Sequence, residues 1–501
     1  MNDKLRSFPG SALFHIAILA TVSTAVLLRY GLSEQPILGD RAYFVYVSQA
    51  VSKGDLLYGS TTFGYTPYGP FLSAMTMHIG DIFNVPSYLA PRYLSLPVYA
   101  ASAALLYLVA RNASGSALAG IFSGLTLSGF GAMSVLCASN LEPKAMVMFF
   151  MLASMLALQK RNWLVTGFAS AMAGMFWQPA AIAGLSMFMI LAFTDRDKLL
   201  PNFLKFSAGM LLGMLPAILY LTAFAEWHNF YEMAVVRKAA LSLPDAASTP
   251  FKWMAKGFKA YRSEGFVFFS ALAGFSYFMI KNGRKTFNAL TDRKDGGMLI
   301  LTLAWFLFNG IEFNGAPDLI PMLPLMAYWS SLFAARLIEG VSFLAGRIAS
   351  NRFVLLTGFI FVNGLLFTDA ITYNLPSTLT EQRLLVESVM GKADRRFIAL
   401  NAEEFYVLSE KKSPLRYTRM ERWVDTVIEM TEPGGSDGFI KRLEESMPPL
   451  VIIKKRKSAN LKRIENELLA GYDVTVYNKI PKHNVEKRKS HEDLYVYEKR
   501  P

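Results

Sequence analysis

The sequence is short of cysteine and of charged residues, and each shortage narrows the class of protein. Cys137 is the only cysteine among 501 residues, so no intramolecular disulfide can form and a disulfide-stapled secreted domain is excluded. Charged residues make up 18% of the chain, below the roughly 25% of an average soluble domain. Hydrophobic residues make up 53%, and this composition indicates a protein of the lipid bilayer.

Short motifs for nucleotide or metal chemistry are also missing. The chain has no Walker loop, no H-E-x-x-H sequence and no cluster of cysteine and histidine. Asp, Glu, Lys and Arg are almost absent from the middle of the apolar runs, where an ion-driven carrier would need them. The formal net charge is +13, but the Lys and Arg residues gather between apolar runs and in the C-terminal tail. That placement is typical of membrane topology, and no nucleic-acid partner is expected.

What the sequence does contain is a series of apolar windows close to the length that crosses a bilayer. They predict a polytopic α-helical membrane protein with about eleven transmembrane helices. A cytoplasmic N-terminus and an extracytoplasmic C-terminus place most Lys- and Arg-bearing loops inside the cell. We therefore expect a multi-pass protein of the cell membrane, that is, the inner or cytoplasmic membrane. The windows cover residues 11–30, 91–110, 115–138, 145–159, 163–178, 179–194, 203–225, 264–281, 297–312, 318–338 and 353–371.

Three segments between or after these windows are too long to be simple connectors, namely 31–90, 226–263 and 372–501. All three are external in the predicted topology, and long loops are where function tends to lie. The predicted domain division is a transmembrane domain over 1–371, which carries the first two segments as external loops, and an extracytoplasmic α/β domain over 372–501.

Local patterns predict the elements of these segments. Apolar residues at helical spacing predict interfacial helices at 41–51 and 67–79 in the first loop. An ordinary structured loop capping a transporter is the alternative. In the tail, helical patterns alternate with short β-like runs. The helical patterns cover 381–391, 418–430 and 457–470, and the β-like runs cover 397–400, 405–408, 450–453 and 474–477.

Asp40 is the first candidate for chemistry. It follows Gly39, begins a helical pattern and lies about ten residues beyond the first apolar window. A carboxylate at that point can be held at the membrane surface as a general base. Because Asp is also a preferred helix N-cap, a purely structural role is the open alternative.

Other ionisable residues collect where apolar windows meet the external side. Glu142 and Asp318 are candidate second carboxylates, and each could instead cap a helix. Arg41, Arg92 and Lys144 suit a phosphate leaving group, and their alternative role is snorkelling to lipid headgroups. No motif requires a cofactor, although a divalent cation would suit Asp40, Glu142 and Asp318 if they converge.

Five segments together resemble the GT-C glycosyltransferases, a superfamily that includes protein O-mannosyltransferases, aminoarabinose transferases and dolichyl-phosphate-mannose mannosyltransferases. They are Gly39–Tyr58, Tyr65–Leu72, Asn140–Lys144, Ala316–Ala327 and Phe397–Tyr417. In that family an Asp shortly after the first span, followed by a helix, begins the active-site loop. Many members carry Asp-Glu where this chain has Asp40-Arg41. The W-W-D motif of oligosaccharyltransferases is absent, so transfer of a whole glycan to asparagine is not expected.

The resemblance implies an enzyme of glycan biosynthesis with membrane lipids as neighbours. By resemblance, Asp40 is the base that activates an acceptor hydroxyl, and the reaction inverts the anomeric carbon. The donor is a polyprenyl-phosphate-linked sugar, with its phosphate near Arg41, Arg92 or Lys144. The acceptor is a glycan, a lipid or a protein, and the enzyme is a hexosyltransferase, with a mannosyltransferase using dolichyl phosphate mannose as one candidate. The alternatives are a transporter or flippase for lipid-linked glycans and a non-catalytic subunit of an envelope glycan assembly complex.

Overall fold

The chain packs into two compact units, each taken from three separated stretches of sequence. The helical unit is drawn from Met1–Leu32, Tyr93–Ala217 and Thr249–Asn374, and the mixed unit from Ser33–Arg92, Ile218–Ser248 and Leu375–Pro501. The computed structural model describes residues 12–194, 196–236, 264–282, 295–311, 316–344, 364, 366–368, 370–375, 377–391, 396–456, 458–482 and 490–499.

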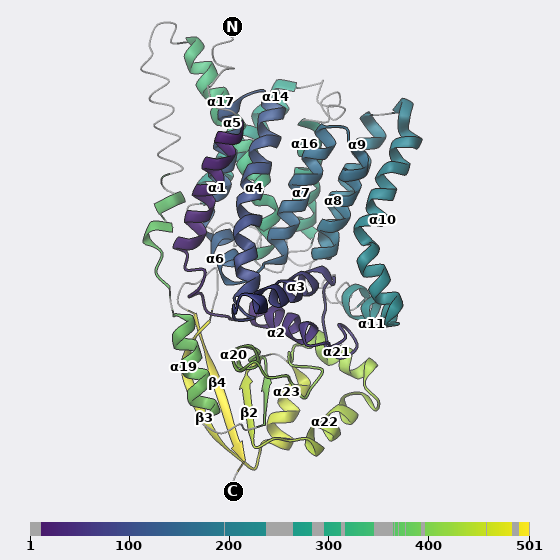
Figure 1. Ribbon diagram of the computed structural model, residues 1–501, viewed down its shortest axis with the longest axis vertical. Helices are drawn as coiled ribbons and strands as arrows, with labels where there is room; N and C mark the ends of the chain where they lie inside the picture. Colours follow the sequence, from purple (N-terminus) through teal and green to yellow (C-terminus); the bar gives the residue numbers. More distant parts are fainter. Residues whose placement is uncertain are drawn as a thin grey trace. The chain divides into compact units, whose positions relative to one another are not determined.

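Long apolar helices make up the helical unit and run roughly parallel to one another (Figure 1). Within the described residues, every predicted apolar window up to residue 338 is mostly helical. The window at 353–371 lies mostly outside the described residues. The helices are α1 (Ala12–Arg29), α4 (Ala90–Ser114), α5 (Ala117–Ser128), α6 (Gly131–Ser139), α7 (Pro143–Gln159), α8 (Trp163–Phe176), α9 (Ala181–Thr194), α10 (Leu199–Ala223), α14 (Glu264–Asn282), α16 (Asp295–Ile311) and α17 (Leu323–Leu344), with the short 3-10 helices η2 (Gln178–Ala180), η3 (Arg196–Lys198) and η6 (Ala316–Met322).

The predicted span at 115–138 is not one continuous helix. The chain breaks around Gly129, and α5 and α6 are bent by 57° against each other. Among the described residues, α1, α4 and α10 are long and apolar enough to cross a membrane, and the bent pair would make a fourth span if it counts as one. The predicted count of eleven spans and the predicted orientation stay predictions.

The mixed unit combines helices with one four-stranded sheet. The sheet order is β1-β2-β4-β3, in which β1 and β2 are parallel and the other neighbours are antiparallel. The strands are β1 (Phe397–Leu400), β2 (Leu450–Lys454), β3 (Tyr472–Lys482) and β4 (Ser490–Lys499). The helices are α2 (Asp40–Ser52), α3 (Tyr68–Ile82), α11 (Trp227–Phe230), α19 (Leu379–Met390), α20 (Glu404–Ser409), α21 (Arg422–Thr431), α22 (Gly435–Glu445) and α23 (Ala459–Arg463), with π-helical turns η4 (Tyr231–Val236) and η7 (Ile464–Leu468).

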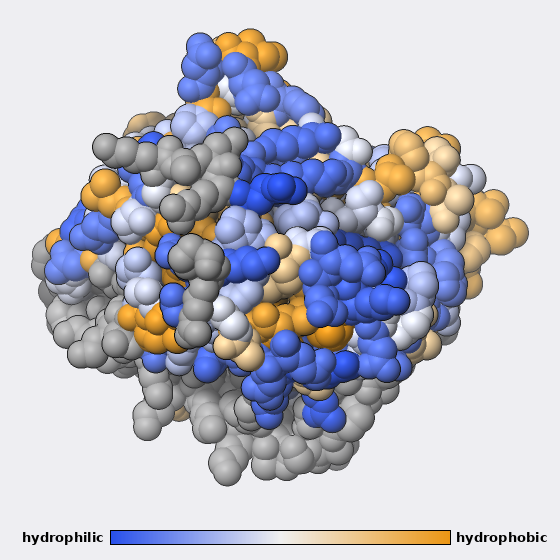
Figure 2. Space-filling model, turned by 90° about the horizontal axis from the view of Figure 1, so that it is seen from below, coloured by the Kyte–Doolittle hydropathy of each residue, from blue (hydrophilic) through white to orange (hydrophobic). Residues whose placement is uncertain are grey.

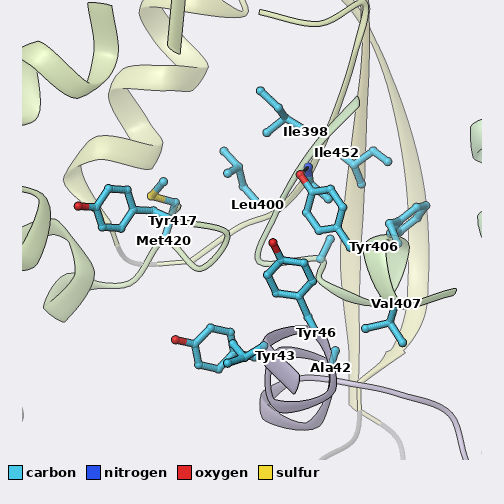
Figure 3. Close-up of a cluster of buried hydrophobic side chains, with 14 of the residues drawn as sticks. Ala42, Tyr43, Tyr46, Ile398, Leu400, Tyr406, Val407, Tyr417, Met420 and Ile452 are labelled. Carbon is cyan, nitrogen blue, oxygen red and sulfur yellow. Dashed lines mark hydrogen bonds between the residues drawn. The ribbon is translucent and has the colours of Figure 1, made fainter. Parts of the chain in front are cut away.

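One hydrophobic core joins residues of the first loop to the C-terminal sheet. Figure 3 shows Tyr43 and Tyr46 of α2 on one side of this core, with Leu400 of β1 and Tyr406 of α20 also pointing into it. Strands β1 and β2 are buried along their whole length, which explains their unbroken apolar sequences. The core therefore fixes α2 to the sheet.

In the structure, residues 33–92 pack with residues 375–501 in the mixed unit. The division predicted from the sequence places residues 33–92 in the transmembrane domain instead. Residues 237–263 of the predicted second external loop lie outside the described residues. The spans 41–51 and 67–79 are helical as predicted, in α2 and α3, whereas their interfacial position stays a prediction. The face of the molecule drawn in Figure 2 is largely hydrophilic, with apolar side chains between polar ones and along one edge.

The tail forms a small α/β arrangement as predicted, with one wrong element. Residues 405–408 were predicted as a strand, but they belong to helix α20. The aromatic ring of Tyr406 packs on Tyr46, with ring centroids 5.3 Å apart, and its hydroxyl accepts a hydrogen bond from the backbone N–H of Ala399. These tertiary contacts override the β propensity of the run.

Candidate active site

Asp40 begins α2, and the residue before it sets its direction. Gly39 has φ 58° and ψ −130°, a conformation that residues with a Cβ avoid. Gly39 also occupies the N-cap position, so the alternative that Asp40 is the helix cap is wrong. Asp40 instead lies in the first turn, where the positive end of the helix dipole favours a carboxylate. Its side chain is 67% exposed.

The rest of α2 is held firmly beneath this carboxylate. Every residue from Arg41 to Ala50 is buried, so the helix is enclosed on all sides. The hydroxyl of Tyr43 donates a hydrogen bond to the carbonyl of Thr62, which ties the helix to the loop before α3. A carboxylate on a fixed helix end is held more precisely than one on a mobile loop.

Arg419, which sequence reasoning missed, lies directly against Asp40. One terminal nitrogen of its guanidinium binds Asp40 Oδ1, and its Nε donates to Glu421 Oε1 at 3.0 Å. The guanidinium also lies over the ring of Tyr43, 5.1 Å from the centroid. The Arg419 side chain is only 12% exposed, so a largely buried cation bonds to an exposed carboxylate.

The charges around Arg419 shift the ionisation of their neighbours. Burial alone lowers the pKa of Arg419, but the carboxylates of Asp40, Glu421 and Glu403 hold it well above its ordinary value. Burial raises the pKa of Glu403 to about 7, against the opposing attraction of Arg419. Burial also raises the pKa of Tyr43 well above its usual range. Arg419 therefore stays cationic at any physiological pH, while Glu403 titrates near neutrality.

The two arginines predicted to bind the donor phosphate are both buried. The Arg41 side chain lies among the buried residues of α2. Arg92 is fully buried, and its Nη1 donates to the backbone carbonyl of Gln35 at 2.7 Å. This bond ties Gln35 to the start of α4. A phosphate-binding role for either arginine stays a prediction.

The helical unit holds a second group of the predicted residues. Lys144 in the first turn of α7 forms an ion pair with Asp318 of η6, with Nζ and Oδ1 2.8 Å apart. The ammonium also lies 4.7 Å from the ring centroid of Trp177. Glu142 is buried at the N-cap position of α7, where its side chain makes no capping bond. The fold thus joins Lys144 and Asp318 across 174 residues of sequence.

Several solved structures are similar to this chain over most of its length. The apo crystal structure of the Archaeoglobus fulgidus oligosaccharyltransferase matches with a TM-score of 0.63 at 11% identity, over 89% of this chain and 70% of that one. ArnT from Cupriavidus metallidurans bound to undecaprenyl phosphate matches with a TM-score of 0.61 at 12% identity, over 97% of both chains. The chain has the GT-C fold.

A third match with the same fold is the archaeal oligosaccharyltransferase AglB from Archaeoglobus fulgidus in complex with an inhibitory peptide and a dolichol-phosphate. Its TM-score is 0.59 at 12% identity, over 91% of this chain and 70% of that one. No family model and no curated protein matches the sequence. The fold that the sequence resemblance implies is thus confirmed.

The apolar helices of this GT-C fold support a membrane location. The site candidates belong to both compact units: Asp40, Arg41 and Arg92 to the mixed unit, and the other three to the helical unit. Within the described residues, no three His, Cys, Asp or Glu side chains form a group that could hold a metal ion.

The missed residues come from one short stretch of the C-terminal segment. The predicted helix at 418–430 begins only at Arg422, so Arg419 and Glu421 lie in irregular chain before α21. A signal was present, because residues 416–423 read RYTRMERW, which is dense in arginine and aromatic side chains. Nothing in the sequence connects that stretch to Asp40.

Proposed function

We propose that this chain is a membrane glycosyltransferase that moves a sugar from a polyprenyl-phosphate-linked donor to an acceptor hydroxyl on the extracytoplasmic side. The observation that carries the proposal is the match over 97% of both chains with ArnT bound to undecaprenyl phosphate. AglB was solved with a dolichol-phosphate, so two matches of the same fold bind a lipid phosphate. Fold alone does not fix chemistry, and the proposal therefore also rests on the site.

Asp40 acts as the base. Its exposed carboxylate takes the proton of the acceptor hydroxyl while that oxygen attacks the anomeric carbon of the donor. The bond between the anomeric carbon and the phosphate oxygen breaks in the same displacement, and the polyprenyl phosphate leaves as an anion. One displacement inverts the anomeric carbon.

The remaining predicted residues have supporting roles in this proposal. Lys144 supplies positive charge for the leaving phosphate, and Asp318 holds its ammonium in place through the 2.8 Å ion pair. Glu142, at the N-cap position of the same helix, is the further carboxylate that orients the acceptor. Arg41 and Arg92, the other two predicted phosphate-binding residues, contribute positive charge from buried positions.

The test is product formation in membranes supplied with a panel of polyprenyl-phosphate sugars, comparing wild type with Asp40→Asn at matched expression. Removal of a general base typically costs about 10²- to 10⁴-fold in rate. Asp437→Asn is a matched control, because Asp437 is also an exposed carboxylate that pairs with an arginine, Arg463. We expect the control to transfer sugar at the wild-type rate.

Each outcome decides between the proposed functions. Transfer by wild type and by Asp437→Asn but not by Asp40→Asn supports the enzyme and its base. Equal transfer by all three proteins removes Asp40 from that role. If wild type transfers no sugar from any donor, the carrier or the non-catalytic subunit becomes the better explanation.

A further inference from the structure

The strongest unassigned feature is the pairing of Asp40 with a C-terminal residue that lies 379 positions away in the sequence. Both residues belong to the mixed unit, and their neighbours Ala42 and Met420 belong to its hydrophobic core. The site described by sequence reasoning contained only residues up to Asp318. The contacts of Arg419 therefore give the C-terminal segment a specific part in the site.

Hydrogen bonds to one asparagine fix the backbone on either side of Arg419. Asn401 follows strand β1 and adopts φ 58°. Its backbone N–H donates to the carbonyl of Thr418 at 2.8 Å, and its side-chain oxygen accepts from the N–H of Met420 at 2.7 Å. Its side-chain nitrogen donates to the carbonyls of Met420 and Lys454. Arg419 is thus anchored to the end of β1 through both of its neighbours.

The guanidinium itself has little freedom. Glu421 accepts a hydrogen bond from its Nε, the ring of Tyr43 lies against its face, and its terminal nitrogen binds Asp40. A planar guanidinium held on two sides presents its remaining donors in a fixed direction. The Asp40 side chain is mostly exposed, and Arg419 supplies a contact that restrains its orientation.

The same C-terminal stretch also fixes the loop that follows α2. A terminal nitrogen of Arg416 donates to the carbonyl of Tyr58 at 2.5 Å, and the N–H of Thr62 donates to the carbonyl of Arg416 at 3.3 Å. The stretch therefore contacts the first loop both at Asp40 and at the turn after α2. Its contacts are concentrated on the part of the loop that carries the proposed chemistry.

We infer that Arg419 is a positioning residue for the transfer reaction, which fixes the orientation and the negative charge of the Asp40 carboxylate. The inference rests on the proposed function. Arg419 acts through Asp40 and does not itself contact the reacting atoms. In this arrangement the C-terminal segment completes the active site.

The kinetic test compares wild type with Arg419→Met and Arg419→Lys. Misplacing a catalytic group by about 1 Å lowers the reaction rate on the order of 10²-fold, so we expect Arg419→Met to lower kcat by about that factor. The KM for the donor should stay within about threefold, because Arg419 does not bind it. Arg419→Lys should recover part of kcat, since the charge returns without the planar fork. Arg463→Met removes an exposed arginine–aspartate pair and should leave both constants unchanged.

The pH profile separates positioning from simple loss of structure. The charged and titratable groups that face the pair are Glu403, Glu421, Tyr43 and Tyr65. Removing the adjacent guanidinium raises the pKa of a carboxyl group, so the acidic limb of kcat should move to higher pH in Arg419→Met. Loss of folded protein would lower the whole profile without moving this limb. An unmoved limb with an unchanged kcat, or equal losses in the Lys and Met variants, would overturn the inference.

A double-mutant cycle on thermal stability tests the pairing of Asp40 with Arg419 without relying on activity. The apparent Tm is measured for wild type, Asp40→Asn, Arg419→Met and the double variant in detergent. Coupled residues give non-additive effects, so Asp40→Asn should change Tm much less in the Arg419→Met background. Additive changes would overturn the inference even if wild type is active. If wild type transfers no sugar, the proposed function fails and a positioning role in transfer falls with it, whereas the cycle still measures the pairing.

Discussion

Replacing Glu403 by glutamine should remove a pH dependence that is built into the mixed unit. Glu403 is buried directly before α20, and burial raises its pKa to about 7. Its Oε1 makes no hydrogen bond to any described residue. The carboxyl is therefore neutral in the folded protein under mildly acidic conditions, and it becomes a buried anion near neutrality.

The sign of the effect follows from proton binding. Between pH 4.5 and about 7 the folded state keeps the Glu403 proton, whereas the unfolded state has lost it. The stability from this raised pKa is fully present below pH 4.5, and it is lost as the pH rises through about 7. The shift in pKa corresponds to about 3 kcal/mol. Wild type should therefore lose about that much stability relative to Glu403→Gln across this window.

The assay is the apparent Tm of both proteins in detergent from pH 4.5 to 8. For a unit of about 200 residues, 3 kcal/mol corresponds to roughly 6–12 °C. As the pH rises, the Tm of Glu403→Gln should increase relative to the Tm of wild type by this amount. Glu444→Gln, at an exposed glutamate of α22, should follow wild type throughout. Parallel curves for wild type and Glu403→Gln would refute the reasoning, because the difference must grow with pH.

Two further substitutions test the helix start and the ion pair of the helical unit. Gly39→Ala should lower the free energy of unfolding by about 1–3 kcal/mol and should also lower the rate of sugar transfer. The reason is that φ 58° is strained for alanine, although no atom lies within 4 Å of the added Cβ. Gly471→Ala adds a Cβ to equally open space without a positive φ and should be nearly neutral in Tm; equal effects would disprove the strain. Lys144→Met should lower the free energy of unfolding by about 3–5 kcal/mol, because it leaves the buried Asp318 carboxylate without its lysine. Arg463→Met removes a pair whose carboxylate, Asp437, is 88% exposed, so it should lower the free energy of unfolding by less than about 1 kcal/mol. A similar cost for both substitutions would argue against the buried pair.

The elements that were correctly predicted are those with a clear local pattern. Helix α2 follows Gly39 with apolar residues at helical spacing, and strands β1 and β2 are unbroken apolar runs. Strand β4 was missed, although Leu494 and Val496 are buried in an alternating pattern, because charged residues surround them. Helix α22 was missed because its first turn contains two glycines.

The tail also shows where a local pattern misleads. Four apolar residues at 405–408 fit a buried strand and a short helix equally well, since periodicity cannot separate the two at that length. The structure selects the helix because Tyr406 packs on Tyr46, which lies 360 residues earlier in the chain. A contact at that separation is a property of the fold and leaves no signal in a window of sequence.

The residues of the candidate site likewise divide into those with a local sequence signal and those without one. Asp40 could be singled out because its neighbours in the sequence, Gly39 and the helix that follows, also determine its structure. Arg419 has no such local signal, since its importance comes from Asn401, Glu421 and Asp40, which only the folded chain brings together. Most lysines and arginines lie in solvent or snorkel to lipid headgroups. Arg419 departs from that expectation because three carboxylates repay the cost of burying its charge, and the closest of them is the proposed base.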